Sequence, residues 1–170
     1  MTLKIMAFGL IALTFASVSP AGADSSAGQA FARLEALVGR WQGENEDGEE
    51  SVKTYRMVAN GTVLQEEYEV VGRDDRSMTT MYHLDGDRLL LTHYCIADNQ
   101  PRMAADLSAD DPSTLRFSFV DATNLASLAD GHMHRVVIDF VDDDHMAQEW
   151  TFQQDGEDAF TETVRYERVD

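Results

Sequence analysis

The chain has 170 residues, of which 31 are acidic and 13 are basic, and its formal net charge is −18. This length allows one domain with one core, because chains usually divide only beyond roughly 250 residues. The strong negative charge repels nucleic acid and anionic lipid, so both are excluded as partners. Cys95 is the single cysteine, which excludes an intramolecular disulfide.

The N-terminus has the three parts of a secretory signal. Lys4 precedes an apolar run over residues 5–18, and Ala21-Gly22-Ala23 follows before Asp24. The run is shorter than the roughly 20 residues that a membrane-spanning helix needs. We expect residues 1–23 to be a cleaved signal peptide and residues 24–170 to be one periplasmic or secreted domain, without stable membrane insertion after cleavage. A retained signal anchor and a buried N-terminal helix are the alternatives.

One amphipathic helix is predicted over residues 26–38. Its apolar side chains recur at steps of three and four, and Gly39 follows as a stop signal. These side chains are Ala30, Phe31, Leu34, Leu37 and Val38.

After Gly39 the apolar pattern changes to a period of two, and turn signals such as Asn60-Gly61 and Asp85-Gly86 separate short runs. Ten strands are predicted, near residues 40–46, 51–59, 62–71, 77–84, 88–96, 102–107, 114–120, 132–141, 145–153 and 159–168. A series of hairpins with one apolar face closes most easily into an antiparallel up-and-down β-barrel, because closure removes exposed edges. A two-sheet sandwich is the alternative.

Some polar residues share a strand face with apolar rows that should point into the barrel. His132 and His134 continue the face of Val136 and Ile138, while His93 and Cys95 continue the face of Leu89 and Leu91; Gln148 and Glu162 are further inward candidates. Burying a polar group without a partner costs roughly 1 to 3 kcal/mol. Such residues are therefore the best candidates for a functional site.

Alternating strand direction places many of these polar residues at the end of the barrel opposite the helix. That end has the form of a ligand entrance, and we expect it to take a small, largely apolar or amphipathic molecule, with Arg102 available for an acidic group. The predicted ligand-binding residues are His93, Cys95, Asn99, Gln100, Arg102, Asn124, His132, His134 and Trp150.

Several segments carry a family resemblance: 82–89, 91–95, 99–103, 130–135 and 148–150. Together they resemble a bacterial family of lipocalin-like domains of unknown function. The resemblance implies a calycin-type barrel whose floor is closed by the tryptophan of Gly39-Arg40-Trp41. The haem-binding nitrobindins are also similar and share Gly39, Trp41 and Gly43, but no histidine lies in the last strand regions where the haem ligand is expected.

Three other functions stay open. The first is a metal or haem site at the entrance, with or without catalysis, because the spacing of His132-x-His134 together with His93 suits zinc. Metal-free catalysis would use Cys95 as nucleophile and a histidine as base. A barrel filled by its own side chains would bind nothing. The sequence leaves the cofactor open and is compatible with a monomer or a homodimer.

Overall fold

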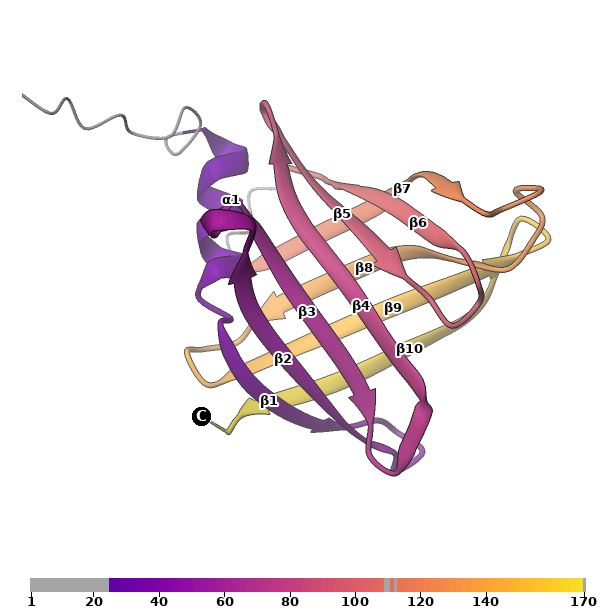
Figure 1. Ribbon diagram of the computed structural model, residues 1–170, viewed down its shortest axis with the longest axis horizontal. Coiled ribbons are helices and arrows are strands. Elements are labelled where there is room, and N and C mark those ends of the chain that lie inside the picture. The colour runs from indigo at the N-terminus through magenta and orange to yellow at the C-terminus, as the bar shows by residue number, and fades with distance from the viewer. Residues whose placement is uncertain (1–24, 109–110, 112, 170) are drawn as a thin grey trace, which may run out of the picture.

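The computed structural model describes residues 25–108, 111 and 113–169, so the predicted signal peptide lies outside the described residues. The described chain forms one α-helix, one short 3-10 helix and ten strands (Figure 1). Their bounds are α1 Ser26–Glu35, β1 Gly39–Glu44, β2 Glu50–Val58, η1 Ala59–Gly61, β3 Val63–Val70, β4 Arg73–Asp85, β5 Arg88–Tyr94, β6 Gln100–Ala105, β7 Thr114–Thr123, β8 His132–Phe140, β9 His145–Gln154 and β10 Glu157–Arg168.

The strands form a closed antiparallel barrel in the order β1-β10-β9-β8-β7-β6-β5-β4-β3-β2. Each strand pairs with its neighbours in sequence, and β1 pairs with β10 to close the ring. The prediction of a ten-stranded up-and-down barrel with one N-terminal helix is therefore confirmed. None of the helices in the described residues is both long and apolar enough to cross a membrane.

Some predicted bounds shift. The helix ends at Glu35 and not at residue 38, because the backbone N–H groups of Leu37 and Val38 bond to the carbonyls of Leu34 and Glu35 in a turn. Gly39, at φ 135°, then starts β1 in a backbone conformation that favours glycine. β4 begins at Arg73 and β6 at Gln100, both earlier than predicted.

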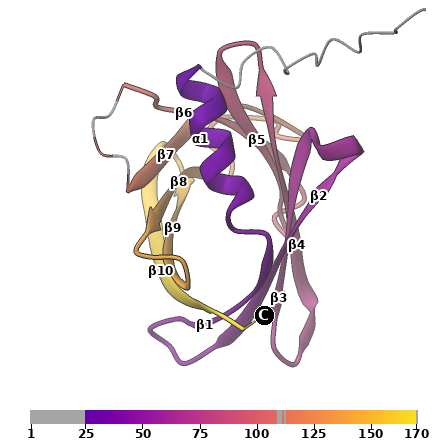
Figure 2. The same ribbon diagram turned by 90° about the vertical axis from the view of Figure 1, so that its left-hand side faces the viewer.

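Helix α1 lies at one end of the barrel, while the β7–β8 and β9–β10 loops lie at the other (Figure 1). Figure 2 shows the molecule from the helix end, with α1 in front. Ser25 caps the helix by accepting a hydrogen bond from the N–H of Gly28 at 3.1 Å. Trp41 is 1% exposed, and its indole N–H donates to the carbonyl of Leu37 at 2.7 Å. The Arg168 guanidinium lies 4.2 Å from the centre of the Trp41 ring. The helix end is thus sealed.

Apolar side chains fill the half of the barrel next to the helix. They come from α1 and from nearly every strand, and strand alternation points them inward. The largest fully buried ones are Trp41, Tyr55, Tyr82, Phe117, Leu34, Leu64, Leu89, Leu91, Met103, Ile138 and Met146. Inside the barrel, space for a ligand therefore lies beyond this core, towards the opposite end.

Candidate functional site

A buried ion pair marks the boundary of the apolar core. Lys53 lies opposite Trp41 in the pairing of β1 with β2, so it shares the inward face of the tryptophan. Its Nζ lies 2.8 Å from Glu66 Oε1, and each side chain is 2% exposed. Burial lowers the pKa of Lys53, and Glu66 opposes this shift. Burial raises the pKa of Glu66, but Lys53 and the hydrogen bonds outweigh it, so this pKa is lowered.

Two tyrosines complete the hydrogen bonding of Glu66. The hydroxyls of Tyr55 and Tyr82 each donate to Glu66 Oε2 at 2.9 Å. Burial raises the pKa of both tyrosines well above 10, so both remain protonated donors at neutral pH. A buried charge pair is stable only when its remaining lone pairs find donors, and this carboxylate has them.

Gln148 of β9 joins this group from across the barrel. Its Nε2 donates to the Tyr55 hydroxyl at 2.8 Å, and its Oε1 accepts from Trp150 Nε1 at 3.0 Å and from Lys53 Nζ. These side chains form what we call the polar belt, defined as Lys53, Tyr55, Glu66, Tyr82, Gln148 and Trp150. The belt lies between the apolar core and the open end.

His93 lies beside the belt with one nitrogen unused. The side chain is 4% exposed, and its ring centre lies 4.6 Å from that of Trp150. Nδ1 shares a 2.9 Å hydrogen bond with Thr80 Oγ1, whereas buried Nε2 has no partner among the described residues. Burial lowers the pKa of His93 to about 4, so the imidazole is neutral at physiological pH.

An inner cavity of about 30 Å³ lies at this point, roughly the space of one water molecule. Strands β2, β3, β4, β5, β8, β9 and β10 all contribute to its wall. The lining residues are Lys53, Glu66, Tyr68, Met78, His93, Met133, Gln148, Trp150, Glu162, Val164 and Tyr166.

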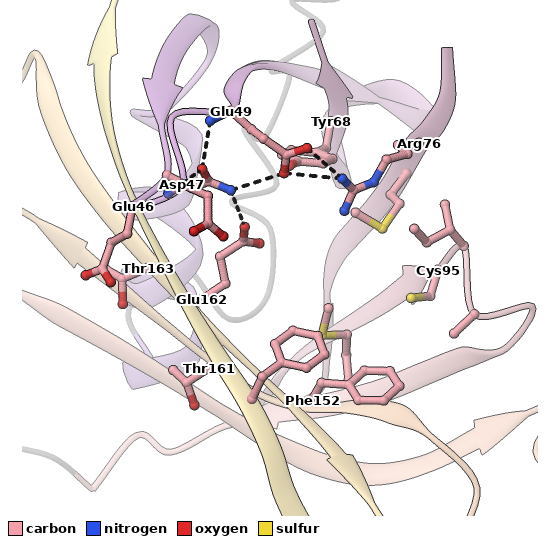
Figure 3. Close-up of a pocket in the computed structure, with 16 residues that line it drawn as sticks. Glu46, Asp47, Glu49, Tyr68, Arg76, Cys95, Phe152, Thr161, Glu162 and Thr163 are labelled. Atoms are coloured by element: carbon pink, nitrogen blue, oxygen red, sulfur yellow. Dashed lines mark hydrogen bonds and ion pairs between the residues drawn. The ribbon is translucent and has the colours of Figure 1, made fainter. Parts of the chain in front are cut away.

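A larger outer cavity of about 630 Å³ opens at the end of the barrel opposite the helix (Figure 3). The β1–β2 and β5–β6 loops, the ends of β3 and β4, and parts of β8, β9 and β10 form it. It shares Tyr68, Met78, Met133 and Glu162 with the inner cavity, so the two are adjacent. The other lining residues are Asn45, Glu46, Asp47, Glu49, Arg76, Cys95, Ile96, Ala97, Phe152, Phe160, Thr161 and Thr163.

Hydrogen bonds fix one side of this entrance. Arg76 Nη1 lies 3.0 and 3.2 Å from the two carboxylate oxygens of Glu49. Asn45 Nδ2 donates to Glu162 Oε1 at 2.8 Å and to Glu49 Oε2 at 3.3 Å (Figure 3). The β1–β2 loop is thereby tied to β4 and β10.

Three of the nine predicted ligand-binding residues line these cavities. His93 and Trp150 line the inner cavity, and Cys95 lines the outer one. Burial raises the pKa of the Cys95 thiol, which lowers its thiolate fraction at neutral pH. Four others line neither cavity, and their side chains are tied to neighbouring segments: Asn99 to Gly131, Gln100 to Thr123, Arg102 to Asp121 and Asn124 to Asp98.

A β-bulge explains why the last two, His132 and His134, line neither cavity. The register of β8 with β9 shifts between Met133 and Arg135, so the inward alternation of Val136 and Ile138 does not continue to the histidines. Met133 lines both cavities in their place. The two histidines pack instead against Phe119, with ring centres at 4.6 and 5.3 Å.

The three histidines predicted as metal ligands do not converge. His132 Nε2 lies 3.3 Å from His134 Nδ1, while His93 is bonded to Thr80 and packs on Trp150. In the described part of the chain, no three side chains of the His, Cys, Asp and Glu types are grouped for a metal ion. The arrangement that the zinc hypothesis requires is not formed by these three side chains.

The sequence pattern holds a signal for the polar belt. Glu66 lies between Leu64 and Tyr68 in a period-two row, and Lys53 lies between Ser51 and Tyr55. Charged residues in an inward phase are the mark of a buried pair. Arg76 lies outside the predicted strand at 77–84, and no pattern in the sequence links it to Glu49.

Comparisons with known proteins support the fold. No family model and no curated protein matches the chain. Among solved structures, the Rv2717c protein from M. tuberculosis is similar with a TM-score of 0.55 at 13% identity, over 83% of this chain and 98% of that one. A protein of unknown function of the DUF3598 family from Nostoc punctiforme has a TM-score of 0.53 at 14% identity, over 80% of this chain. This chain spans only 49% of that protein. At these identities the likeness shows a shared barrel fold.

Proposed function

We propose that this protein binds a small, largely apolar molecule through the open end of its barrel, in the periplasm or after secretion. The observation that carries the proposal is an open outer cavity that adjoins an inner cavity lined by His93, whose buried Nε2 has no partner among the described residues. Leaving a buried polar atom unpaired costs about 1 to 3 kcal/mol, which a polar group of the ligand would offset. The export part rests on the N-terminal pattern of residues 1–23.

The outer cavity has the size and lining of a small-molecule site. Its volume of about 630 Å³ falls in the range of roughly 300 to 1,000 Å³ that is usual for such sites. Tyr68, Met78, Met133, Phe152 and Phe160 supply apolar wall. The filled half of the barrel and the polar belt beneath give this wall a rigid support.

Catalysis by Cys95 has less support. Its thiol pKa is raised by burial, and none of the five histidines of the chain forms a hydrogen bond with it in the described residues. A nucleophilic cysteine needs the opposite, a lowered pKa and an adjacent base. Binding is therefore the function that we propose.

A titration with the neutral fluorescent probe N-phenyl-1-naphthylamine tests the proposal. Met133→Trp fills the space between the two cavities and should weaken probe binding at least tenfold, because Met133 lines both. Leu128→Trp is the matched control, since Leu128 is 67% exposed and lines neither cavity. Circular dichroism and melting curves establish that both variants fold. Equal probe binding by both folded variants would count against a site in the barrel.

A further inference from the structure

The outer cavity carries an excess of negative charge. Its wall contains four carboxylates and one guanidinium, which is a formal net charge of −3 at neutral pH. The guanidinium belongs to Arg76 and is already paired with Glu49. Lys53 lies deeper and is balanced by Glu66. The carboxylates are those of Glu46, Asp47, Glu49 and Glu162.

Glu162 is the carboxylate at the junction of the two cavities, because it alone of the four lines both. It lies on β10, in the same alternation as buried Val164 and Tyr166. Asn45 donates to its Oε1, and none of the Lys and Arg side chains in the described residues lies within ion-pair distance of it, although the charge of Glu162 acts on Lys53 of the inner cavity and opposes the lowering of the Lys53 pKa. A half-buried carboxylate without a direct ion-pair partner attracts a positive group more strongly than a carboxylate in open water does.

The aromatic lining of the outer cavity also favours a positively charged ligand. Phe152 and Phe160 stack with their ring centres 5.0 Å apart and an angle of 9° between the planes. Tyr68 lies on another strand of the wall, and Lys53 Nζ already lies 5.4 Å from the centre of its ring. The faces of aromatic rings are negative and attract cations.

The unpartnered nitrogen of His93 is compatible with a cationic donor. When Nδ1–H donates to Thr80 Oγ1, the buried Nε2 becomes an acceptor, and His93 lines the inner cavity together with Lys53 and Glu162. An ammonium N–H would donate a hydrogen bond to this acceptor. A carboxylate has no hydrogen to donate and would be repelled by the carboxylate of Glu162.

We propose that the ligand is a cationic amphiphile, an apolar or aromatic body with an ammonium group, and that the site rejects carboxylates such as fatty acids. This inference rests on the proposed binding function and replaces the expectation that Arg102 holds an acidic group. Arg102 pairs with Asp121 and lines neither cavity. The high negative charge of the whole chain attracts cations to the protein as well.

Three probes with one naphthalene body separate charge from shape: 2-naphthylmethylammonium, 2-naphthylmethanol and 2-naphthoate. In calorimetric titrations at low salt, the ammonium should bind about tenfold or more tighter than the carboxylate, with the alcohol between them. The ratio should shrink in 1 M NaCl, where the screening length falls to about 3 Å.

Glu162→Gln tests the role of the Glu162 charge, because it removes the charge and keeps an oxygen that can accept a hydrogen bond from Asn45. The variant should reduce the preference for the ammonium several-fold, while Glu167→Gln should leave it unchanged. Glu167 is an exposed residue of the same strand near the helix end, so the control makes the same change in net charge.

The outcomes distinguish the two proposals. Equal affinity for the ammonium and the carboxylate, or tighter binding of the carboxylate, would overturn the cation preference and leave small-molecule binding intact. Equal loss of preference in Glu162→Gln and Glu167→Gln would overturn the role of Glu162. Absence of binding by all three probes, together with probe binding that Met133→Trp does not change, would overturn both.

Discussion

The buried, neutral imidazole of His93 predicts a loss of stability in weak acid. Its pKa is lowered by burial from 6.5 to about 4 in the folded chain. Between these two values the unfolded chain takes up a proton that the folded chain does not. The stability that His93 contributes is therefore fully present above pH 6.5 and is lost as the pH falls towards 4. A difference of about 2.5 pKa units, at 1.36 kcal/mol per unit, gives a loss of about 3 kcal/mol.

Urea unfolding between pH 7 and pH 4 measures this loss, with His93→Gln as the comparison. Glutamine keeps a polar side chain but does not titrate, so the many carboxylates affect both proteins alike. The free energy of unfolding of the wild type should fall relative to His93→Gln by about 3 kcal/mol over this range. A constant difference between the two proteins from pH 7 to pH 4 would refute the buried, neutral state of His93.

Three further predictions concern the belt, the sealed end and the thiol. Lys53→Met leaves the Glu66 carboxylate buried without its cation and should lower the free energy of unfolding by about 3 to 5 kcal/mol. Adding Glu66→Gln should recover part of this loss. A single variant as stable as the wild type in urea unfolding would contradict the prediction. Trp41→Ala should cost about 3 to 5 kcal/mol, because a fully buried indole and its hydrogen bond are lost; an unchanged melting temperature would argue against this. Cys95 should react with iodoacetamide at pH 8 more slowly than glutathione, since burial raises its pKa; a faster reaction would contradict the raised pKa.

The fold was predictable because it depends on local signals that repeat along the chain. Alternation of apolar residues and turn pairs such as Asp85-Gly86 define each hairpin without reference to the rest of the barrel. Trp41 followed from the Gly39-Arg40-Trp41 resemblance, and the structure places it in the sealed end. The position of the open end followed from the up-and-down order of the strands.

The site was only partly predictable, because it depends on irregular pairing and on contacts across the barrel. The bulge at His134 changes which β8 side chains line the cavities, and nothing in the alternation marks it. The approach of Gln148 to Lys53 joins β9 to β2, which the sequence separates widely. The side of the entrance that is hollow, near Arg76 and not near Arg102, follows from the shape of the closed ring.

The seam between β1 and β10 has a consequence for how the chain folds. Every other strand pair joins neighbours in sequence and needs only a short loop to close, whereas this seam sets Trp41 opposite Arg168 with almost the whole described chain between them. Bringing such distant segments together has the largest entropic cost, so we expect the seam to form last and to set the folding rate. Until it forms, β1 and β10 are unprotected sheet edges that can pair with another molecule. Aggregation during refolding should therefore respond most to substitutions in these two strands.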